Sequence, residues 1–312
     1  MADRPGLSLV IPCYNSADTI GPLVAALATL RVEGGHEVVL VNDGSQDDTA
    51  AVCREVVRSA AIPVVFVDLA RNFGEHNAVM AGLRVARGEY VITMDDDGQN
   101  PPAEAEKLYR YARESGRDVV YTYYAEKQHA GWRNLGSWLT NRVADLLLDK
   151  PKGLYLSSFR CMNAFVVEQI CHYDGPYPYV DGLLFQVTQN VGSMEVAHQE
   201  RRVGRSGYTL QKLVRLWLNM FLNFSVVPLR VASVLGLVLS IVGFLATIEV
   251  VVESMLTNTP PGWGSLMFAL FVFCGVQLLT VGLVGEYVGR LYLTANRRPQ
   301  SVVRAVVRRD GA

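Results

Sequence analysis

The sequence has few cysteines and no cysteine motif. Five are scattered along the 312 residues: Cys13, Cys53, Cys161, Cys171 and Cys274. The lack of a CxxC pair or a Cys/His cluster argues against a disulfide framework and against a zinc site. The first apolar stretch, residues 7–12, is too short to be the core of a signal peptide. We therefore expect the N-terminal part to stay in the reducing cytosol.

An excess of charge of either sign is also missing. The chain carries 29 Lys and Arg against 30 Asp and Glu, a formal net charge of −1. Without a broad electropositive field, a nucleic acid partner is not expected, and any anion must be bound locally. At this length, with 50% hydrophobic residues, the chain can form one large soluble domain and a smaller second part.

Two long apolar segments, residues 231–252 and 264–285, stand out in the second half. The first holds one charge, Glu249, and the second holds none. A helix of this length spans about 33 Å, enough to cross a bilayer core. Two buried core helices are the alternative, but globular helices this long normally keep a polar face. We therefore predict two transmembrane helices.

Basic residues flank this pair of segments on the outside, and the connector, residues 253–263, has no Lys or Arg. The flanking residues are Lys212, Arg215 and Arg230 before the pair and Arg290, Arg297, Arg298, Arg304, Arg308 and Arg309 after it. By the positive-inside rule, both termini face the cytoplasm. Residues 208–230, rich in Leu and aromatic residues, predict an amphipathic helix in the membrane interface or, alternatively, an ordinary core helix.

Short apolar, β-branched runs alternate with helical patterns over residues 1–120. This alternation predicts an α/β domain of βαβ units around a parallel sheet. The expected strands are residues 7–12, 37–42, 64–69, 90–94 and 118–121, and the expected helices are residues 18–30, 47–59, 75–86 and 103–114. In such folds, ligands bind beyond the carboxyl ends of the strands.

Polar segments follow four of these strands: Pro12-Cys13-Tyr14-Asn15, Asn42-Asp43-Gly44-Ser45, Arg71-Asn72-Phe73-Gly74-Glu75-His76 and Asp95-Asp96-Asp97-Gly98-Gln99-Asn100. Adjacent carboxylates repel one another unless a cation or hydrogen-bond donors compensate. Oxygen ligands of this kind suit Mg²⁺ or Mn²⁺ held together with a substrate phosphate. Each segment alone could be a turn or a helix cap. Their joint occurrence predicts a site for a nucleotide diphosphate.

These motifs resemble the family 2 glycosyltransferases of the GT-A fold. Further segments are similar to the polyprenyl-phosphate branch of that family: Arg71 to His76, Met80-Ala81-Gly82, Gln99-Asn100-Pro101-Pro102 and Gly285-Glu286-Tyr287-Val288-Gly289-Arg290. The resemblance covers nearly the full chain. It implies a GT-A, Rossmann-like, mostly parallel sheet with helices on both faces at residues 1–207, juxtamembrane amphipathic helices at 208–230, a two-helix transmembrane hairpin at 231–285 and a cytosolic basic tail at 286–312.

The resemblance implies a metal-dependent, inverting glycosyltransferase. Such an enzyme moves a sugar from a nucleotide sugar, with uridine as the expected base, onto undecaprenyl phosphate or another polyisoprenyl phosphate. The cofactor would be Mg²⁺ or Mn²⁺. The expected place is the cytoplasmic face of the bacterial inner membrane, where the product serves envelope glycan modification. Relatives of this family also suggest a homotetramer.

Residue roles follow from the same resemblance. The metal ligands would be Asp95, Asp97 and Gln99, and the catalytic residues would be Asp97, Arg201 and Ser158. The nucleotide would contact Pro12, Tyr14, Asn15, Asp43, Arg71, Asn72, Gly74, His76, Asp95 and Asp96. The acceptor phosphate would be bound by Arg201, Ser206 and Tyr208, and a guanidinium can bind phosphate oxygens bidentately. Independently of the resemblance, Lys127 and Arg133 are local candidates for the same role, and the basic Lys212 near the membrane interface could attract the lipid phosphate.

The sequence departs from the family pattern at several of these places. Ser16 and Gly207 stand where the family usually has Glu and a frequent Lys, and Ser158 lies in a segment where many relatives place an Asp proposed as the catalytic base. Tyr123 and Tyr124 lie near a position where relatives tend to carry Arg, which leaves Lys127 and Arg133 as local substitutes. Because a lipid phosphate is already an anion at neutral pH, it needs little deprotonation. We therefore expect direct in-line displacement with inversion.

Two other functions remain open at this stage. Gln199-Glu200-Arg201-Arg202-Val203 imitates the Gln-x-x-Arg-Trp signature of processive polysaccharide synthases, but the Trp is missing and two spans are too few for a translocating pore. A catalytically inactive membrane scaffold would keep the fold for partner binding. The intact acidic run at Asp95 to Asp97 argues against such a scaffold.

Overall fold

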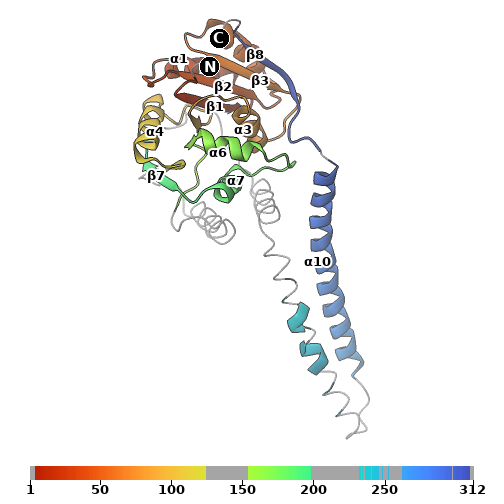
Figure 1. Cartoon of the computed structure of the whole chain (residues 1–312). Coiled ribbons are helices and arrows are strands. Elements are labelled where there is room, and N and C mark those ends of the chain that lie inside the picture. The colour runs from red at the N-terminus through yellow and green to blue at the C-terminus, as the bar shows by residue number, and fades with distance from the viewer. Residues whose placement is uncertain are drawn as a thin grey trace. The chain divides into compact units, whose positions relative to one another are not determined.

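The computed structural model describes residues 4–123, 154–197, 262–296 and 298–309, with scattered helical residues between 232 and 252. It divides the chain into two compact units (Figure 1). The first consists of Met1–Trp217 and Arg297–Ala312, and the second of Leu218–Asn296. The chain therefore leaves the first unit and returns to it at its C-terminal end.

A mixed sheet forms the centre of the first unit, and its described strands have the order β7-β5-β6-β4-β1-β2-β3-β8. β1 pairs in parallel with β2 and β4, β2 with β3, and β5 with β7, whereas β6 and β8 run antiparallel to their neighbours. The strands are β1 (Leu7–Cys13), β2 (His36–Asn42), β3 (Val64–Leu69), β4 (Tyr90–Thr93), β5 (Val119–Tyr123), β6 (Arg160–Asn163), β7 (Val191–Glu195) and β8 (Val303–Arg308). The predicted, mostly parallel α/β sheet is confirmed.

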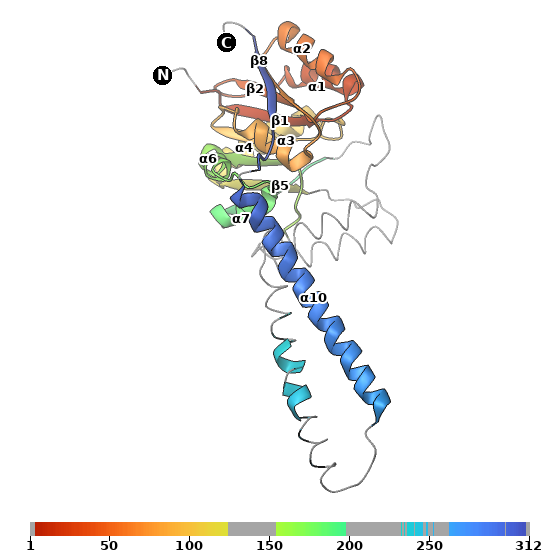
Figure 2. The same cartoon turned by 90° about the vertical axis from the view of Figure 1, so that its right-hand side faces the viewer.

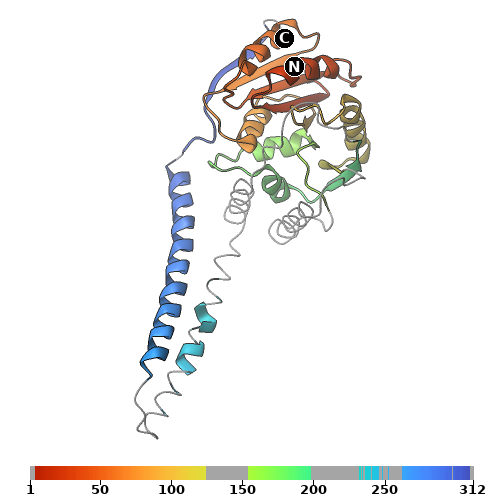
Figure 3. The same ribbon diagram turned by 180° about the vertical axis from the view of Figure 1, so that it is seen from behind.

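Helices lie on both sides of the sheet (Figure 1, Figure 3). They are α1 (Ala17–Leu27), α2 (Thr49–Ser59), α3 (Glu75–Leu83), α4 (Pro102–Ser115), α6 (Ala164–Cys171) and α7 (Val180–Val187). Side chains of α1, α2 and α4 share one core cluster with Leu9 and Ile11 of β1. α3 packs on the opposite face, where Gly82 lies against Val10 and Val41. β1, β2 and β3 are buried almost throughout because both faces are covered.

The predicted strands and helices of residues 1–123 are confirmed to within a few residues, and β3 has the predicted bounds. The predicted βαβ pattern did not include β6, which lies between β4 and β5 and runs antiparallel to both. β6, Arg160–Asn163, has a polar residue at each end and two apolar residues between them, so neither alternation nor an apolar run is visible in the sequence.

The C-terminal residues differ from the predicted basic tail, 286–312. Helix α10 (Trp263–Ala295) continues past Gly285, and β8 joins the sheet along β3. Figure 2 shows β8 as a blue strand among the elements of the first unit. Basic residues such as Arg304, Arg308 and Arg309 had favoured a cytosolic basic tail here. Strand β8 instead covers the edge of β3, a strand that is buried along its whole length.

Among the described residues, one helix is long and apolar enough to cross a membrane, the 24-residue segment Val272–Ala295 of α10. It spans about 36 Å. Apolar side chains such as Leu278, Val281 and Leu291 are exposed along it. The structure describes the other predicted span, residues 231–252, only at scattered positions, and Gly236–Leu245 within it is a shorter apolar helix. Two transmembrane helices are therefore not confirmed.

Candidate active site

The loops after β1 and β4 meet at the carboxyl ends of the strands, where the sequence predicts the site. Asp96 Oδ2 accepts hydrogen bonds from the backbone N–H of Tyr14, at 3.3 Å, and from Ser16 Oγ. Burial raises the pKa of Asp96, and the hydrogen bonds from Ser16 and Tyr14 act in the opposite direction. Asp96 therefore ties the acidic run to the Pro12-to-Asn15 motif.

Asp95 is the most strongly perturbed acid of this run. Ser158 Oγ donates a hydrogen bond to Asp95 Oδ2 over 2.8 Å, and the backbone carbonyl of Ser158 accepts one from Thr93 Oγ1 at 2.6 Å. Burial and the negative charge of Glu75 raise the pKa of Asp95 to about 7, with smaller contributions from Asp97 and Asp96; the bond from Ser158 opposes the rise. A cation at this place would relieve the repulsion between these acids.

Glu75, the first residue of α3, was not among the predicted site residues. Glu75 is exposed, but desolvation by the surrounding protein raises its pKa. The positive charge of Arg160 opposes that rise, and the negative charges of Asp181 and Asp96 add to it. Glu75 therefore belongs to the acidic rim together with Asp95.

The loops after β1 and β2 are linked by reciprocal hydrogen bonds. The backbone N–H of Asn15 donates to Ser45 Oγ at 3.0 Å, and Asn15 Oδ1 accepts from the backbone N–H of Gln46 at 2.9 Å. Asn15 has a φ of 54°, a left-handed conformation that Asn tolerates better than most residues. Both segments that were predicted to contact the nucleotide are thus held in one fixed arrangement, with the Tyr14 side chain exposed beside them.

Asp43 holds the loop between β3 and α3. Its carboxylate is 4% exposed and accepts hydrogen bonds from the backbone N–H groups of Phe73, at 2.7 Å, and Gly74, at 2.9 Å. Burial raises the pKa of Asp43, and these two donors oppose the rise. The Arg71 guanidinium lies over the Phe73 ring, 4.5 Å from its centroid. Both carboxylate oxygens of Asp43 therefore support the loop, and its predicted contact with the nucleotide stays a prediction.

His76, in the first turn of α3, meets Tyr179 at the start of α7. The two rings are arranged edge to face, with centroids 5.1 Å apart. Burial lowers the pKa of His76 to about 4, so the imidazole is neutral at physiological pH. A neutral imidazole can donate and accept a hydrogen bond, which suits the predicted role of His76 in nucleotide binding.

A buried ion pair that the sequence did not predict lies behind this rim. Arg160 of β6, which is 3% exposed, pairs with Asp181 of α7, and Asp181 Oδ1 also accepts a hydrogen bond from the Tyr121 hydroxyl at 2.8 Å. The Tyr121 ring stacks on Phe185. Desolvated charges of this kind need such partners. The pair fixes α7 to β6, which directly follows Ser158 and pairs with β4, the strand before the acidic run.

The metal assignment to Asp95, Asp97 and Gln99 is not tested by the geometry. The backbone N–H of Gln99 donates to Asp97 Oδ1 at 3.0 Å, which closes a tight turn after the acidic run. In the described part of the chain, no three His, Cys, Asp or Glu side chains are grouped as metal ligands. Mg²⁺ and Mn²⁺ that bind with a nucleotide commonly use one or two carboxylates and take the remaining ligands from phosphates and water, so the residues present fit such an ion.

The predicted acceptor-phosphate residues lie outside the described residues: Lys127, Arg133, Arg201, Ser206, Tyr208 and Lys212. Of the other predicted residues, Pro12, Arg71, Asn72 and Gly74 lie in or next to the loops described above. Sequence reasoning missed the site contacts of Ser16, Glu75, Arg160, Tyr179 and Asp181. Ser16 directly follows one of the polar segments and Glu75 lies inside another, whereas the other three depend on tertiary contacts.

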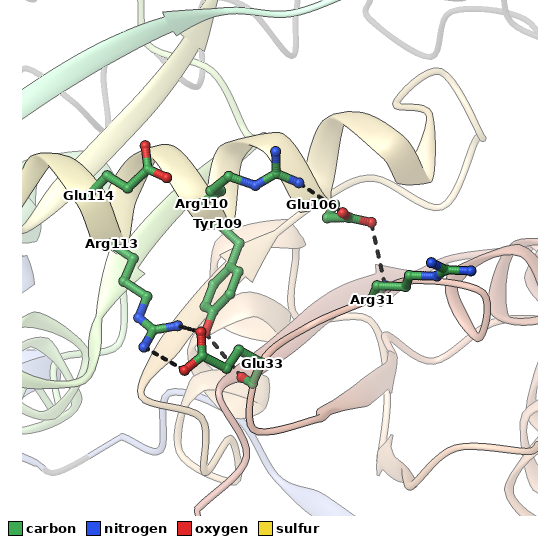
Figure 4. Close-up of a pocket in the computed structure, with 7 residues that line it drawn as sticks. All are labelled: Arg31, Glu33, Glu106, Tyr109, Arg110, Arg113 and Glu114. Atoms are coloured by element: carbon green, nitrogen blue, oxygen red, sulfur yellow. Dashed lines mark hydrogen bonds and ion pairs between the residues drawn. The ribbon is translucent and has the colours of Figure 1, made fainter.

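A pocket lies between helix α4 and the segment that precedes β2, away from the carboxyl ends of the strands. It measures about 510 Å³ and is lined by Arg31, Glu33, Glu106, Tyr109, Arg110, Arg113 and Glu114. Four of its charged side chains form two ion pairs, Arg113 with Glu33 and Arg110 with Glu106 (Figure 4). The pocket contains no residue of the acidic rim, so we do not assign it to the candidate site.

The sequence is similar to curated transferases over nearly its whole length. The profile of glycosyl transferase family 2 matches residues 8–170. The undecaprenyl-phosphate 4-deoxy-4-formamido-L-arabinose transferase of Serratia proteamaculans is 32% identical over 308 residues, which cover 96% of this chain and 94% of that protein. The protein of the same name from Edwardsiella ictaluri is 33% identical over 311 residues, with coverages of 97% and 94%.

The fold also occurs in solved structures. Glucosyl-3-phosphoglycerate synthase from Mycobacterium tuberculosis superposes with a TM-score of 0.51 at 18% identity, over 69% of this chain and 79% of that chain. That crystal contains Mn²⁺, uridine-diphosphate-glucose and phosphoglyceric acid. At this identity the likeness establishes the fold alone.

Proposed function

Because the chain belongs to glycosyl transferase family 2, we propose that it transfers a sugar from a nucleoside diphosphate, with uridine as the base, to undecaprenyl phosphate. The transferases from Serratia proteamaculans and Edwardsiella ictaluri support this acceptor, because their names specify it and they match this chain almost end to end. The observation that carries the proposal is the acidic run at the carboxyl end of β4, tied to the loop after β1 through Asp96 and to Ser158 through Asp95.

The donor end of the site is formed by the loops after β1, β2 and β3. Asn15 and Ser45 fix two of these loops to each other, and Asp43 fixes the third. The exposed Tyr14 and Arg71 side chains and the neutral His76 imidazole would contact the nucleotide. Preorganised loops of this kind bind a ligand without a further ordering cost.

Asp95, Asp97 and Gln99 would hold a divalent cation, Mg²⁺ or Mn²⁺, together with the donor diphosphate. When bound, such a cation neutralises charge on the departing nucleoside diphosphate. The chain's own contribution is to keep the carboxylates in place, through the donors Ser158 to Asp95 and Ser16 and Tyr14 to Asp96. These fixed donors offset the repulsion between acids before substrate arrives.

Transfer would proceed by direct displacement with inversion. An oxygen of the lipid phosphate forms the new bond to the anomeric carbon, while the bond from that carbon to the nucleoside diphosphate breaks and the diphosphate leaves with the electron pair. A phosphate monoester is ionised at neutral pH, so no side chain has to remove a proton first. Ser158 agrees with this chemistry, since its hydroxyl hydrogen is donated to Asp95 and Ser158 is no base.

The acceptor implies a membrane location. A polyprenyl tail leaves the bilayer only at a large free-energy cost, and α10 exposes apolar side chains along a length that matches a bilayer core. We propose that residues 231–252 form a second span, with both termini on the cytoplasmic side of the inner membrane. The acceptor phosphate would then bind to Lys127, Arg133, Arg201, Ser206, Tyr208 and Lys212, and assembly as a homotetramer stays a prediction.

The test is an assay of membranes that contain the full chain, with undecaprenyl phosphate, Mn²⁺ and a panel of nucleotide sugars, in which the lipid product is weighed by mass spectrometry. A product that is one sugar heavier than the acceptor is expected, and the mass gain identifies the sugar. The variant Asp97→Asn should lose this product. A polymeric product would contradict the proposed function. Transfer by Asp97→Asn at the wild-type rate would contradict the metal assignment.

A further inference from the structure

The segment that follows α10 contacts the loop between α6 and α7. Gln300 is 5% exposed, and its Nε2 donates hydrogen bonds to the backbone carbonyl of Gly175, at 3.0 Å, and to that of Tyr173, at 3.4 Å. The loop runs on to Tyr179, whose ring contacts His76 at the donor end of the site. A C-terminal side chain is thus connected to the site through one short loop.

The same segment also holds the start of the loop that carries Arg71. The backbone N–H of Ala70 donates to the carbonyl of Val302 at 2.8 Å, and the carbonyl of Ala70 accepts from Arg304 Nη2 at 3.1 Å. The far end of this loop is held by Asp43 through Phe73 and Gly74. Only Arg71 and Asn72 therefore lie between two fixed points.

Gln300 is not needed to cover the sheet edge. It precedes β8, and the pairing of β8 with β3 begins at Val303. Within the described residues its Oε1 has no hydrogen-bond partner although it is buried. The hydrogen bonds of the amide within these residues are therefore made by its N–H donors, and both of their acceptors lie in the loop that leads to Tyr179.

We propose that Gln300 is a positioning residue for nucleotide binding. Through the carbonyls of Tyr173 and Gly175, it fixes the loop that ends in Tyr179, and Tyr179 fixes the His76 ring. The inference rests on the proposed function, because it takes the loops around His76 as the place where the donor nucleotide binds. Four residues, 296–299, separate Gln300 from the last residue of α10. The segment that follows the apolar helix therefore also supports the loops where the donor nucleotide is proposed to bind.

The experiment compares Gln300→Ala and Gln300→Glu with wild type in the full chain, purified in detergent. Glu has nearly the same shape but has no N–H donors, so both variants lose the contacts to the loop. A misplaced His76 weakens binding of the donor and leaves the reacting groups at Asp95 and Ser158 in place. We expect KM for the nucleotide sugar to rise about 3- to 10-fold, the scale of coupling between connected sites, while kcat stays within about twofold.

The matched control is Arg309→Ala. Arg309 Nη1 also donates to a backbone carbonyl, that of Ala60, at 3.2 Å, but this contact lies at the far end of the same segment, against the end of α2. The control should leave KM unchanged. If Arg309→Ala raises KM as much as the Gln300 variants do, or if those variants lower kcat and leave KM unchanged, Gln300 has only a structural role.

A second variant tests the route to the site. Tyr179→Leu should raise KM by itself, and the double variant with Gln300→Ala should be no worse than the more affected single variant, because both changes act on His76. Additive effects of the two changes on KM would show that Gln300 does not act through Tyr179.

Calorimetry with UDP and Mn²⁺ separates failure of the proposed function from failure of the inference about Gln300. Wild type that does not bind UDP contradicts the proposed function and the inference with it, whereas equal binding by wild type and Gln300→Ala contradicts the inference alone.

Discussion

Ser158 donates a hydrogen bond to Asp95 Oδ2 over 2.8 Å. Ser16 makes a similar contact with the neighbouring Asp96. By resemblance to the family, both serines stand where an acid is expected, Glu at position 16 and Asp near position 158. An acid at either position would add negative charge to carboxylates whose pKa values are already raised. The two departures therefore share one physical effect, since each replaces a repelling charge by a donor.

Ser158→Ala should move the acid limb of the pH–rate profile to higher pH. The bond from Ser158 lowers the pKa of Asp95, so its loss raises that pKa further above about 7. Asp95 has to be ionised to hold a cation. A shift of about one pH unit is expected from the loss of one hydrogen bond to a charged group. The measurement is the rate of sugar transfer between pH 6 and 9 at subsaturating Mn²⁺.

Ser157→Ala is the control for this prediction. Ser157 Oγ accepts hydrogen bonds from Thr122 Oγ1 and from the backbone N–H of Phe159, so the change removes a neighbouring serine hydroxyl that has no bond to Asp95. Its pH–rate profile should keep the wild-type shape. Identical shifts in both serine variants would show that the profile reports a general disturbance of the segment before β6.

Asp95→Asn should stabilise the metal-free protein while it abolishes transfer. The folded-state pKa of Asp95 is raised to about 7, above the value of about 3.9 in an unfolded chain. Wild type therefore loses stability as the pH rises from about 4 through 7, and the variant does not. At pH 8, Tm of the variant should be a few degrees higher, since 1 kcal/mol shifts Tm by about 2–4 °C at this size.

Thermal unfolding at pH 5 and pH 8, with and without Mn²⁺ and UDP, checks this prediction. The difference in Tm between variant and wild type should be larger at pH 8 than at pH 5, and the ligands should raise Tm of wild type only. A variant that is less stable than wild type at pH 8 would show that the Asp95 carboxylate is favourably paired in the folded protein.

Local patterns made the first half of the fold and the acidic rim predictable. β1 to β4 are short apolar runs with polar residues directly after them, and Asp43 and Asp95 to Asp97 occupy those positions. The pairing of Arg160 with Asp181 leaves no such pattern, because the two residues lie on different elements that meet only after folding. For the same reason the sequence predicted that Asp43 contacts the nucleotide but did not predict its hydrogen bonds with the backbone of Phe73 and Gly74.

β8 was missed because its partner is far away in the sequence. Arg304 bonds to Ala70 across 234 positions, and no short-range pattern reports such a contact. Its Val-rich alternation was visible, but three arginines next to an apolar helix favoured a basic tail by the positive-inside rule. The rule concerns the side of the membrane, and a strand on the cytoplasmic side satisfies it equally well.

Truncation after Asn296 should cause aggregation of the purified protein. It removes β8 and leaves β3, six buried residues, as an unprotected edge strand. Size-exclusion chromatography in detergent is the measurement. A chain that ends after Arg309 keeps β8 and should elute like wild type. A monodisperse, active protein that ends at Asn296 would show that the sheet does not need β8.

Gly44→Ala should be far more damaging than Gly98→Ala. Both glycines have positive φ, 65° and 71°, so an alanine at either position is strained by about 1 kcal/mol. A Cβ on Gly98 meets nothing within 4 Å, whereas a Cβ on Gly44 would lie 2.3 Å from the carbonyl carbon of Arg71 and 2.4 Å from the nitrogen of Asn72.

This close approach makes Gly44 the point where the loop after β2 supports the loop that carries Arg71. Gly98→Ala should lower the free energy of unfolding by about 1 kcal/mol, the cost of the positive φ alone. Gly44→Ala has to push Arg71 and Asn72 away, so it should cost about 3 kcal/mol or more, as overpacking does, and should raise KM as well. Equal losses of stability in the two variants would mean that strain at the glycine alone matters and that the contact with Arg71 does not position the loop.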